Sequence, residues 1–204
     1  MIHPDTELKF INDTIGYGVV ATRLIPKGTI TWVMDKLDRV FHPADIDRYD
    51  PVYREIFDKY CFRDSSGNLV LCWDISRFVN HSFRPNCITT AYDFELAVRD
   101  IYPGEELTDD YGFLNVTEPF ECLPELGVSR EKVMPDDLLY FHKEWDAQLL
   151  ESFGHFNEVS QPLKQLIAPK HAAKVEEIVT GKGKMDSILL NYYDGRKNGN
   201  GHKK

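Results

Sequence analysis

The chain has 204 residues, of which 42% are hydrophobic and 28% are charged. This composition is typical of a folded globular protein and excludes a disordered chain. Lys and Arg number 24 against 33 Asp and Glu, which gives a formal net charge of −9. An acidic chain of this kind is not held to nucleic acid by charge, so we expect no direct nucleic-acid partner.

Short strand-like runs separated by turns fill the chain from Phe10 to Tyr111. The runs are residues 19–21, 29–33, 69–73, 88–92 and 95–98, with turns expected at Lys27-Gly28, Ser66-Gly67-Asn68 and Pro103-Gly104. Residues 43–60 have a helical pattern. We expect this helix to be broken at Pro51, because proline lacks an amide hydrogen and disfavours helix before it.

The pattern becomes helical after Pro119. An apolar stripe at steps of three and four predicts a helix beginning near Pro135 whose apolar face packs against the β part. Its members are Leu138, Phe141, Trp145, Leu149 and Phe153. We expect further helices over residues 160–168, with Ser160 as the N-cap, and over residues 169–180. The polar, glycine-rich residues 194–204 predict a disordered tail.

The cysteines and the N-terminus bear on the compartment. The four cysteines, Cys61, Cys72, Cys87 and Cys122, are too widely spaced for a zinc knuckle or a redox pair. We expect free thiols in a reducing compartment. The N-terminus shows no secretory signal, and no apolar run approaches the roughly 18 residues that cross a bilayer. These features predict a cytoplasmic protein without a membrane partner, or a nuclear one if the host is eukaryotic.

Three segments contain residues suited to chemistry. Gly16-Tyr17-Gly18 could let a ligand approach the backbone closely, although a short G-x-G is more often a turn. Residues 77–87 contain Asn80 and His81, which can both donate and accept hydrogen bonds to a polar ligand. A buried turn with satisfied polar groups is the plainer interpretation.

The second segment also places Ser82 after His81, which raises nucleophilic hydrolysis. The sequence provides neither a G-x-S-x-G elbow nor an orienting acid, so this hypothesis ranks last. In the third segment, residues 103–113, four carboxylates follow closely, but their spacing matches no calcium loop. A solvated acidic turn explains them better, and Tyr111 beside Gly112 is the part of this segment that we assign to function.

Taken in order, the segments resemble the successive signatures of the SET-domain family of protein lysine methyltransferases. These are Gly16-Tyr17-Gly18, Lys27-Gly28-Thr29, R-F-V-N-H-S-x-x-P-N-C over residues 77–87, Ala97-Val98-Arg99-Asp100-Ile101, and G-E-E-L-T-x-D-Y-G over residues 104–112. The resemblance runs from about Ile15 to Phe113, nearly half the chain. Five such signatures in the correct order are very unlikely to arise by chance.

The resemblance implies a mostly β fold of small curved sheets with a pseudoknot, followed here by a C-terminal helical subdomain, α+β overall. We expect the SET domain over residues 1–116 and the helical subdomain over residues 117–193. The pseudoknot would bring the N-H-S and D-Y-G strands to one site.

The implied activity is methyl transfer from S-adenosyl-L-methionine to the side-chain amine of a protein lysine, without a metal. Gly16, Tyr17, Gly18, Asn80 and His81 would bind this cofactor. Tyr111 would contact the cofactor too and would be the catalytic residue at the end of the lysine channel. The partner would be a protein with an accessible lysine in a basic segment, because the chain is acidic.

Three departures from the family pattern concern a metal and the channel. Many members end in a zinc-binding cysteine segment, but Phe83, Pro124 and Ser129 stand where three of its four ligands would be, so structural zinc cannot bind. The Y-x-G-E after the second strand is replaced by residues 32–36. Thr89 stands where some members place a channel tyrosine, which predicts a roomier channel and products beyond one methyl. The alternative function is therefore a catalytically weak or inactive module that binds cofactor or a protein partner.

Overall fold

The computed structural model describes residues 1–195, so the predicted tail lies outside the described residues from 196 onward. The strands are β1 Thr6–Asn12, β2 Gly16–Ala21, β3 Ile30–Val33, β4 Arg39–Phe41, β5 Cys61–Arg63, β6 Leu69–Leu71, β7 Asn80–His81, β8 Cys87–Thr89, β9 Phe94–Ala97, β10 Thr108–Asp109, β11 Phe120–Glu121 and β12 Lys132–Val133. The helices are α1 Pro43–Ile46, α2 Arg54–Tyr60, α3 Asp137–His155 and α4 Pro169–Val179, with 3₁₀ turns η1 Pro51–Tyr53, η2 Ile75–Phe78, η3 Tyr111–Phe113, η4 Lys164–Leu166 and η5 Ile188–Asn191.

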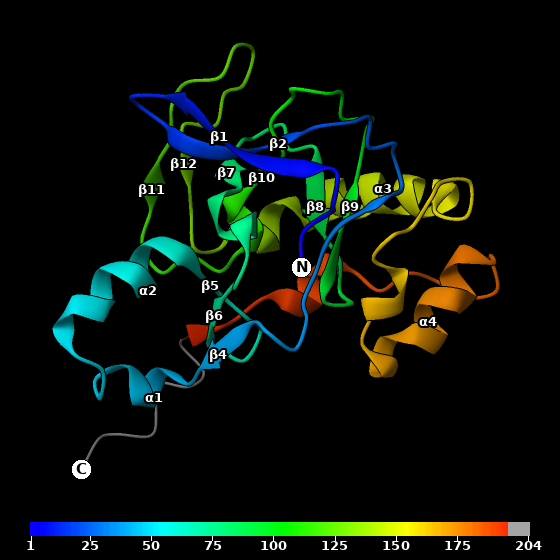
Figure 1. Cartoon of the computed structure of the whole chain (residues 1–204). Helices are drawn as coiled ribbons and strands as arrows, with labels where there is room; N and C mark the ends of the chain where they lie inside the picture. The colour runs from blue at the N-terminus through cyan, green and yellow to red at the C-terminus, as the bar shows by residue number, and fades with distance from the viewer. Residues whose placement is uncertain (196–204) are drawn as a thin grey trace.

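The strands form small separate sheets (Figure 1). The central sheet has the order β3-β9-β8, a second has the order β4-β6-β5, and β1 with β2 and β11 with β12 make two-stranded ribbons, all antiparallel. The helices α3 and α4 lie on the opposite side of the molecule from α1 and α2. Small sheets followed by a helical C-terminal part make the α+β architecture that the sequence predicts.

One short parallel pair crosses the chain order. Strand β7 pairs with β10, so that Asn80 lies opposite Thr108 and His81 opposite Asp109. The buried amide of Asn86 holds this crossing: its Nδ2 donates to the Glu106 carbonyl at 2.7 Å, and its Oδ1 accepts from the Thr108 amide at 2.8 Å. The expectation that the N-H-S and D-Y-G segments meet is therefore confirmed.

The predicted break in the first helical segment is confirmed, and one predicted helix is wrong. Helix α1 ends at Ile46, and Asp50 caps the next turn, which begins with Pro51. Over residues 160–168 only the single turn η4 forms, and Ser160 caps no helix. The reason is tertiary: the Gln161 side chain bonds the Ile30 amide at 2.9 Å and the Gly28 carbonyl at 2.7 Å, which ties this segment across the central sheet.

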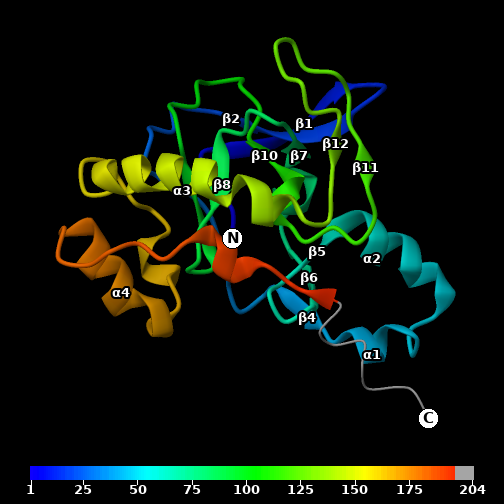
Figure 2. The same ribbon diagram turned by 180° about the vertical axis from the view of Figure 1, so that it is seen from behind.

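A single large core joins the central sheet to the C-terminal helices. Figure 2 shows α3 running across the back of β8. Trp145, Leu149 and Phe153 of α3 are buried against residues of β3, β8 and β9, which confirms the predicted apolar stripe as core packing. The predicted boundary between residues 116 and 117 stays a prediction. The ribbon β11–β12 precedes the first helix of this part, and the helices share the core of the sheet.

The cysteines form no disulfide among residues 1–195. All four cysteines are free, with Cys72 and Cys87 buried and the other two half-buried. Within residues 1–195, no helix combines the length and the apolar character that crossing a membrane requires.

Because the core is shared, truncating α3 should destabilise the β part together with the helices. Trp145 is 3% exposed, and its ring meets that of Phe113 at 5.4 Å, two residues after Tyr111. We expect Trp145→Ala to lower the free energy of unfolding by about 3–5 kcal/mol. Chemical denaturation followed by circular dichroism and by tryptophan fluorescence should give coincident transitions.

The matched control is Tyr140→Ala in the same helix, where the side chain is 72% exposed. This variant should stay within about 0.5 kcal/mol of the wild type. A Trp145→Ala protein in which the helices unfold in a separate, earlier transition would contradict a shared core.

Candidate active site

The residues predicted to bind cofactor come together at the edge of β2 and β7. Asn80 Nδ2 donates to the Tyr17 carbonyl at 3.0 Å and to Glu106 Oε1 at 2.6 Å. A Cβ on Gly18 would lie only 2.2 Å from Glu106 Oε1, so a side chain at this position would require Glu106 to move. Gly16 has a φ of +83°, which glycine adopts without strain. The backbone and packing therefore favour glycine at both positions of the G-x-G, in addition to any role in binding a ligand.

His81 presents a neutral imidazole with one unused nitrogen. Its Nδ1 accepts from the Tyr111 amide at 3.1 Å, and its ring contacts those of Phe83 and Tyr111. Burial and the nearby Arg130 guanidinium lower the pKa of His81 to about 4. Because Nδ1 accepts a hydrogen bond, the neutral ring bears its proton on Nε2. This donor is buried and has no partner among residues 1–195.

Tyr111 connects this edge to the interior. It begins the turn η3, which Asp110 caps by accepting from the Gly112 amide at 2.9 Å. The Tyr111 hydroxyl donates to the Val79 carbonyl at 2.8 Å. Burial raises the pKa of this phenol, with Asp109 and Glu106 adding to the effect. The hydroxyl therefore stays protonated and remains a hydrogen-bond donor at neutral pH.

A cavity of about 250 Å³ opens beside Tyr111. Strand pairing explains its floor: Glu95 lies opposite Trp32 on one side and opposite Thr89 on the other. The remaining wall comes from α2, β5, β6, η2, β10 and the residues after η3. Trp32, Tyr60 and Phe62 provide aromatic rings, so the absence of a tyrosine at Thr89 does not leave the cavity without them.

Two tyrosines that could have replaced a ring at Thr89 lie elsewhere. Tyr92 is buried in the core, where its hydroxyl bonds the Asp186 carboxylate and amide. Tyr17 is exposed on β2 and packs against Phe10. Neither lines the cavity.

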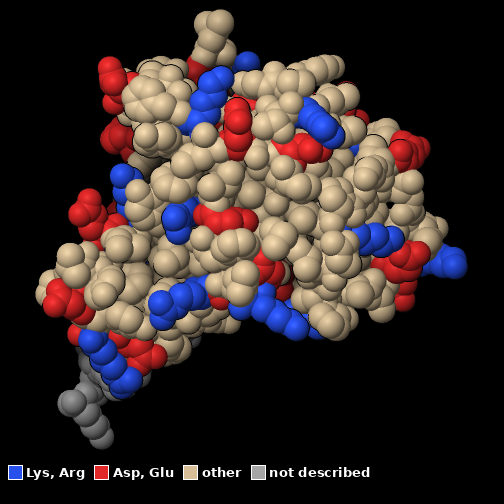
Figure 3. Space-filling view, in the orientation of Figure 1, with Lys and Arg blue, Asp and Glu red and all other residues tan. Residues whose placement is uncertain are grey.

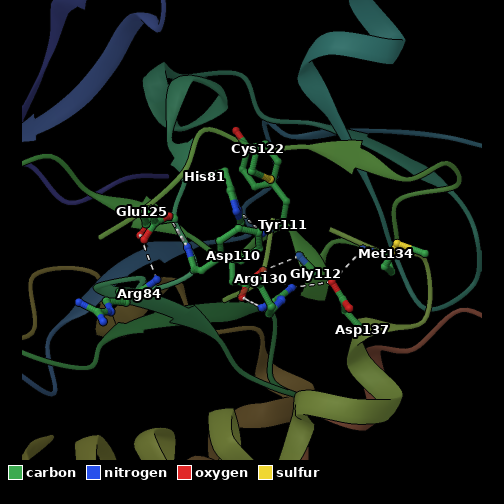
Figure 4. Close-up of polar contacts among 12 residues, drawn as sticks. His81, Arg84, Asp110, Tyr111, Gly112, Cys122, Glu125, Arg130, Met134 and Asp137 are labelled. Carbon is green, nitrogen blue, oxygen red and sulfur yellow. Dashed lines mark hydrogen bonds and ion pairs between the residues drawn. The ribbon is translucent and has the colours of Figure 1, made fainter. Parts of the chain in front are cut away.

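A buried ion cluster closes the site on the side of the ribbon β11–β12 (Figure 4). Arg130 pairs with Asp110 and with Asp137 of α3, at 2.5 Å each. Its guanidinium lies between the rings of Phe83 and Phe141, at 4.4 and 4.3 Å from their centroids. One side chain thus ties together the segment before η3, the helix α3 and the segment before β12.

Phe83, one of the residues that stand in place of the family's zinc-binding cysteines, lies next to this cluster. Phe83, at the position of one family ligand, packs on Arg130 instead. Within residues 1–195, no group of three His, Cys, Asp or Glu side chains could hold a metal ion. The residues present therefore do not fit the zinc site of other family members, and Arg130 makes the connections that close this segment.

Sequence reasoning missed Glu106, Phe120, Glu125 and Arg130. Phe120 places its ring 6.4 Å from that of His81 and 6.0 Å from that of Tyr111. Glu125 accepts from the Phe83 amide at 2.8 Å, so it anchors the loop between β11 and β12. The only sequence signal for Arg130 is a lone basic residue in a polar stretch, which points to no particular partner.

The hydrolase hypothesis does not match the geometry. The Ser82 hydroxyl donates to Glu125 Oε2 at 3.1 Å and accepts from the Arg84 amide. His81 Nδ1 is bonded to the Tyr111 amide, and its Nε2 has no partner among the described residues. No serine–histidine pair exists here to activate a nucleophile.

Comparison with known proteins identifies the fold family. Residues 16–112, which include the G-x-G strand, the crossed β7–β10 pair and Tyr111, match the family model of the SET domain. These residues, just under half of the chain, are thus similar to the SET domain. The resemblance stated from the sequence is thus confirmed.

Similar proteins include several histone methyltransferases. The chain is 30% identical over 117 residues to "Histone-lysine N-methyltransferase Set2" of Drosophila melanogaster, a match covering 52% of this chain and 5% of that protein. It is 38% identical over 90 residues to "Histone-lysine N-methyltransferase, H3 lysine-4 specific" of Schizosaccharomyces pombe, covering 39% and 10%. The "H3 lysine-9 specific" enzyme of the same yeast is 35% identical over 115 residues, covering 47% and 23%.

These matches span at most about a quarter of the relatives' lengths. Among solved structures, the methyltransferase domain of human SETMAR superposes with a TM-score of 0.44 at 20% identity, over 64% of this chain and 58% of that one. The three named relatives thus link this chain to histone-lysine methyltransferases by sequence similarity over part of their length.

The ion cluster predicts a large effect of Arg130 on stability. Asp110 and Asp137 have side chains only 1% and 5% exposed, so Arg130→Met would leave two buried carboxylates without their cation. We expect the free energy of unfolding to fall by about 3–5 kcal/mol. The measurement is urea denaturation at neutral pH.

The control for Arg130 is Lys132→Met in the same ribbon. Lys132 pairs with Glu121, but both side chains are more than half exposed. Exposed pairs contribute little, so Lys132→Met should unfold at nearly the same urea concentration as the wild type. An equal fall in the free energy of unfolding in the two variants would show that the buried ion cluster stabilises the fold no more than an exposed ion pair does.

The environment of His81 predicts a neutral ring down to acidic pH. Its pKa is lowered from 6.5 to about 4, so the unfolded chain binds a proton here that the folded chain does not. The contribution of His81 to stability is therefore complete above pH 6.5 and is lost as pH falls toward 4. NMR titration of the imidazole should give a midpoint near 4, with the exposed ring of His42 as the internal reference. A His81 midpoint near 6.5 would mean that the ring is not desolvated as described.

Proposed function

We propose that this chain is a protein-lysine N-methyltransferase that uses S-adenosyl-L-methionine. The observation that carries the proposal is the position of Tyr111. Its amide donates to His81, beside the G-x-G strand, while its side chain lines the cavity. A single residue thus joins the proposed cofactor-binding edge to the cavity, as transfer between two substrates requires. The printed names of the relatives support the same class of reaction.

Gly16, Tyr17, Gly18, Asn80 and His81 are proposed to hold the cofactor. His81 Nε2 is a buried donor without a partner among residues 1–195, which fits a polar acceptor on a ligand. Asn80 retains its Oδ1 for a ligand donor, because its Nδ2 makes both of its hydrogen bonds within the described residues. The exposed ring of Phe120 offers an apolar surface beside them. When bound, S-adenosyl-L-methionine supplies a methyl group on a sulfonium.

The cavity residues are proposed to receive the lysine side chain. An amine must lose its proton before it can attack a methyl group, and lysine has a reference pKa near 10.4. The aromatic rings of the wall disfavour the charged ammonium and lower that pKa, whereas Asp109 and Glu95 in the same wall favour the ammonium when they are ionised. Tyr111 remains protonated, so its hydroxyl can orient the amine and stabilise the polarised transition state. Both effects act by positioning and solvation and need no metal.

A binding module that transfers nothing is the second candidate. The observation favouring it is that the Tyr111 hydroxyl already donates to the Val79 carbonyl at 2.8 Å. A module would bind cofactor or a protein partner with the same edge residues and would leave this hydrogen bond unchanged. Transfer requires that the Tyr111 oxygen accept from or reorient toward an incoming amine.

The proposed substrate is a protein lysine in a basic segment. The formal charge of −9 favours encounter with positively charged segments over distances of about 8 Å at physiological salt. On the face shown in Figure 3, however, basic and acidic side chains are interspersed. The attraction is thus assigned to the overall charge and not to one acidic patch on that face. We propose the cytoplasm or the nucleus as the location, without contact with nucleic acid.

The experiment is Tyr111→Phe, assayed for cofactor binding by calorimetry and for methyl transfer to a panel of lysine-rich basic proteins. We expect unchanged cofactor affinity and about a hundredfold loss of rate, because one transition-state donor is removed. The control Tyr102→Phe alters a tyrosine that is 60% exposed and should keep the wild-type rate.

The two candidates separate in the same assay. A wild-type protein that binds cofactor but methylates no member of the panel supports the module. A Tyr111→Phe protein within twofold of the wild-type rate would remove Tyr111 from catalysis. Asn80→Ala should weaken cofactor binding in either case, because it leaves ligand groups unpaired.

A further inference from the structure

The cavity beside Tyr111 contains two buried carboxyl groups whose presence the proposed reaction does not explain. Asp109 is 6% exposed and Glu95 is 8% exposed, and both line the cavity. Within residues 1–195 neither forms an ion pair with Lys, Arg, His or the N-terminus. Burying carboxyl groups without a cation is costly. Each carboxyl group must therefore either be protonated or be complemented by a ligand.

Two residues that line this cavity also have buried polar atoms without a hydrogen-bond partner among the described residues. Asp109 Oδ1 is buried and has no hydrogen-bond partner among the described residues. The indole Nε1 of Trp32, which lies opposite Glu95 in the strand register and lines the same cavity, is also buried and unpartnered there. Buried polar atoms are nearly always hydrogen-bonded. An acceptor and a donor left open in one cavity therefore indicate a polar ligand.

Strand pairing fixes this arrangement. Asp109 lies in β10 opposite His81, and Glu95 lies in β9 between Trp32 and Thr89. Both carboxyl groups thus stand on strands at the inner part of the cavity, while the exposed Asp58 lies on helix α2. Groups on strands are held more precisely than groups on loops.

We propose that Asp109, backed by Glu95, is a cation-binding site for a primary alkylammonium, the end group of a lysine side chain. A carboxylate in a dry cavity binds an ammonium by a charge-assisted hydrogen bond, which is stronger than a neutral one. The inference deepens the proposed function, on which its identification of lysine rests. It makes Asp109 a specificity residue that recognises the amine directly, beside Tyr111.

The protonation of Glu95 and Asp109 gives a second way to test the cation site. Burial raises the pKa of Glu95 to about 7. Burial also raises the pKa of Asp109 well above its usual range, and the nearby Glu95 carboxyl adds to that shift. The titratable and charged groups around the pair are Asp58, Tyr60, Cys61, Arg63, Cys72, Arg77, Cys87, Asp110, Tyr111 and the amino group of Met1. Of these, the Met1 amino group lowers the pKa of Glu95 and Asp110 raises that of Asp109.

A cation binds the ionised form and must displace a proton from the protonated one. Its affinity should therefore rise with pH through the region near 7, while an alkylammonium of pKa near 10 keeps its own charge.

The test uses n-butylammonium chloride as the probe and needs neither cofactor nor methyl transfer. The probe is titrated into the full chain, and the indole NH resonance of Trp32 is followed by NMR. We expect a saturable shift whose affinity increases between pH 6 and pH 8. Neutral n-pentanol, of similar shape, should bind at least about tenfold more weakly. No saturable shift with butylammonium, or equal affinities for the two probes, would overturn the proposal.

Asp109→Asn keeps the size of the side chain and removes its charge. We expect about tenfold or greater loss of butylammonium affinity and a weaker dependence on pH. Glu95→Gln should reduce the pH dependence as a second, independent variant, and the indole resonance of buried Trp145 reports whether each variant is folded. The matched control Asp58→Asn removes an exposed carboxylate from the same cavity wall and should change the affinity less than twofold.

These outcomes separate the inference from the proposed function. Wild-type affinity in folded Asp109→Asn overturns the cation site even if the chain methylates lysine. Specific butylammonium binding that is lost in Asp109→Asn supports the site even if no methyl transfer is found.

Discussion

The crossed pair of β7 and β10 is the constraint on which the site depends. These two strands have only two residues each, and by themselves they would contribute little to stability. They persist because the buried side-chain amide of Asn86, which follows β7 in the chain, bonds the backbone of Glu106 and Thr108 at β10. This pairing places His81 next to the segment leading to Tyr111, so that residues of two distant motifs share one hydrogen bond. Without it, the ligand edge and the cavity would not share a wall.

The C-terminal part stabilises this crossing from outside. Arg130 forms ion pairs with Asp110, directly before Tyr111, and with Asp137 at the start of α3. The aromatic rings of Phe83 and Phe141 exclude water from the guanidinium, which strengthens both pairs. Trp145 then packs against Phe113 just beyond Tyr111. The helices therefore hold the site through a buried ion cluster and the shared core, and no metal-binding group is found among the described residues.

The two sides of Tyr111 differ in electrostatic character. On the ligand edge, His81 is kept neutral by burial and by Arg130. On the cavity side, burial raises the pKa of Glu95 to about 7, and burial together with Glu95 raises the pKa of Asp109 well above its usual range. The first side suits uncharged hydrogen bonding and the second suits a cation. In the proposed reaction, this contrast would help to orient two different reactants at one residue.

Local patterns in the sequence were sufficient for much of the fold. The apolar stripe of Trp145, Leu149 and Phe153 depends on helical periodicity alone, and Pro51 breaks its helix through its own ring. The helix expected after Ser160 failed because Gln161 bonds Gly28 and Ile30, which are far away in the chain. Local propensity contains no information about such contacts.

The same distinction holds at the site. Asn80, His81 and Tyr111 could be singled out from the order of the motifs, since each motif is a continuous run of residues. The meaning of Arg130, Phe120 and Asp109 depends on which distant segments fold against them. From the sequence, Asp109 was interpreted as one of several solvated acidic residues in a turn. Strand pairing instead buries it beside Tyr111 in a cavity. The sequence by itself determined which residue types were available, and only the tertiary structure decided which of them were removed from water and therefore had their chemistry changed.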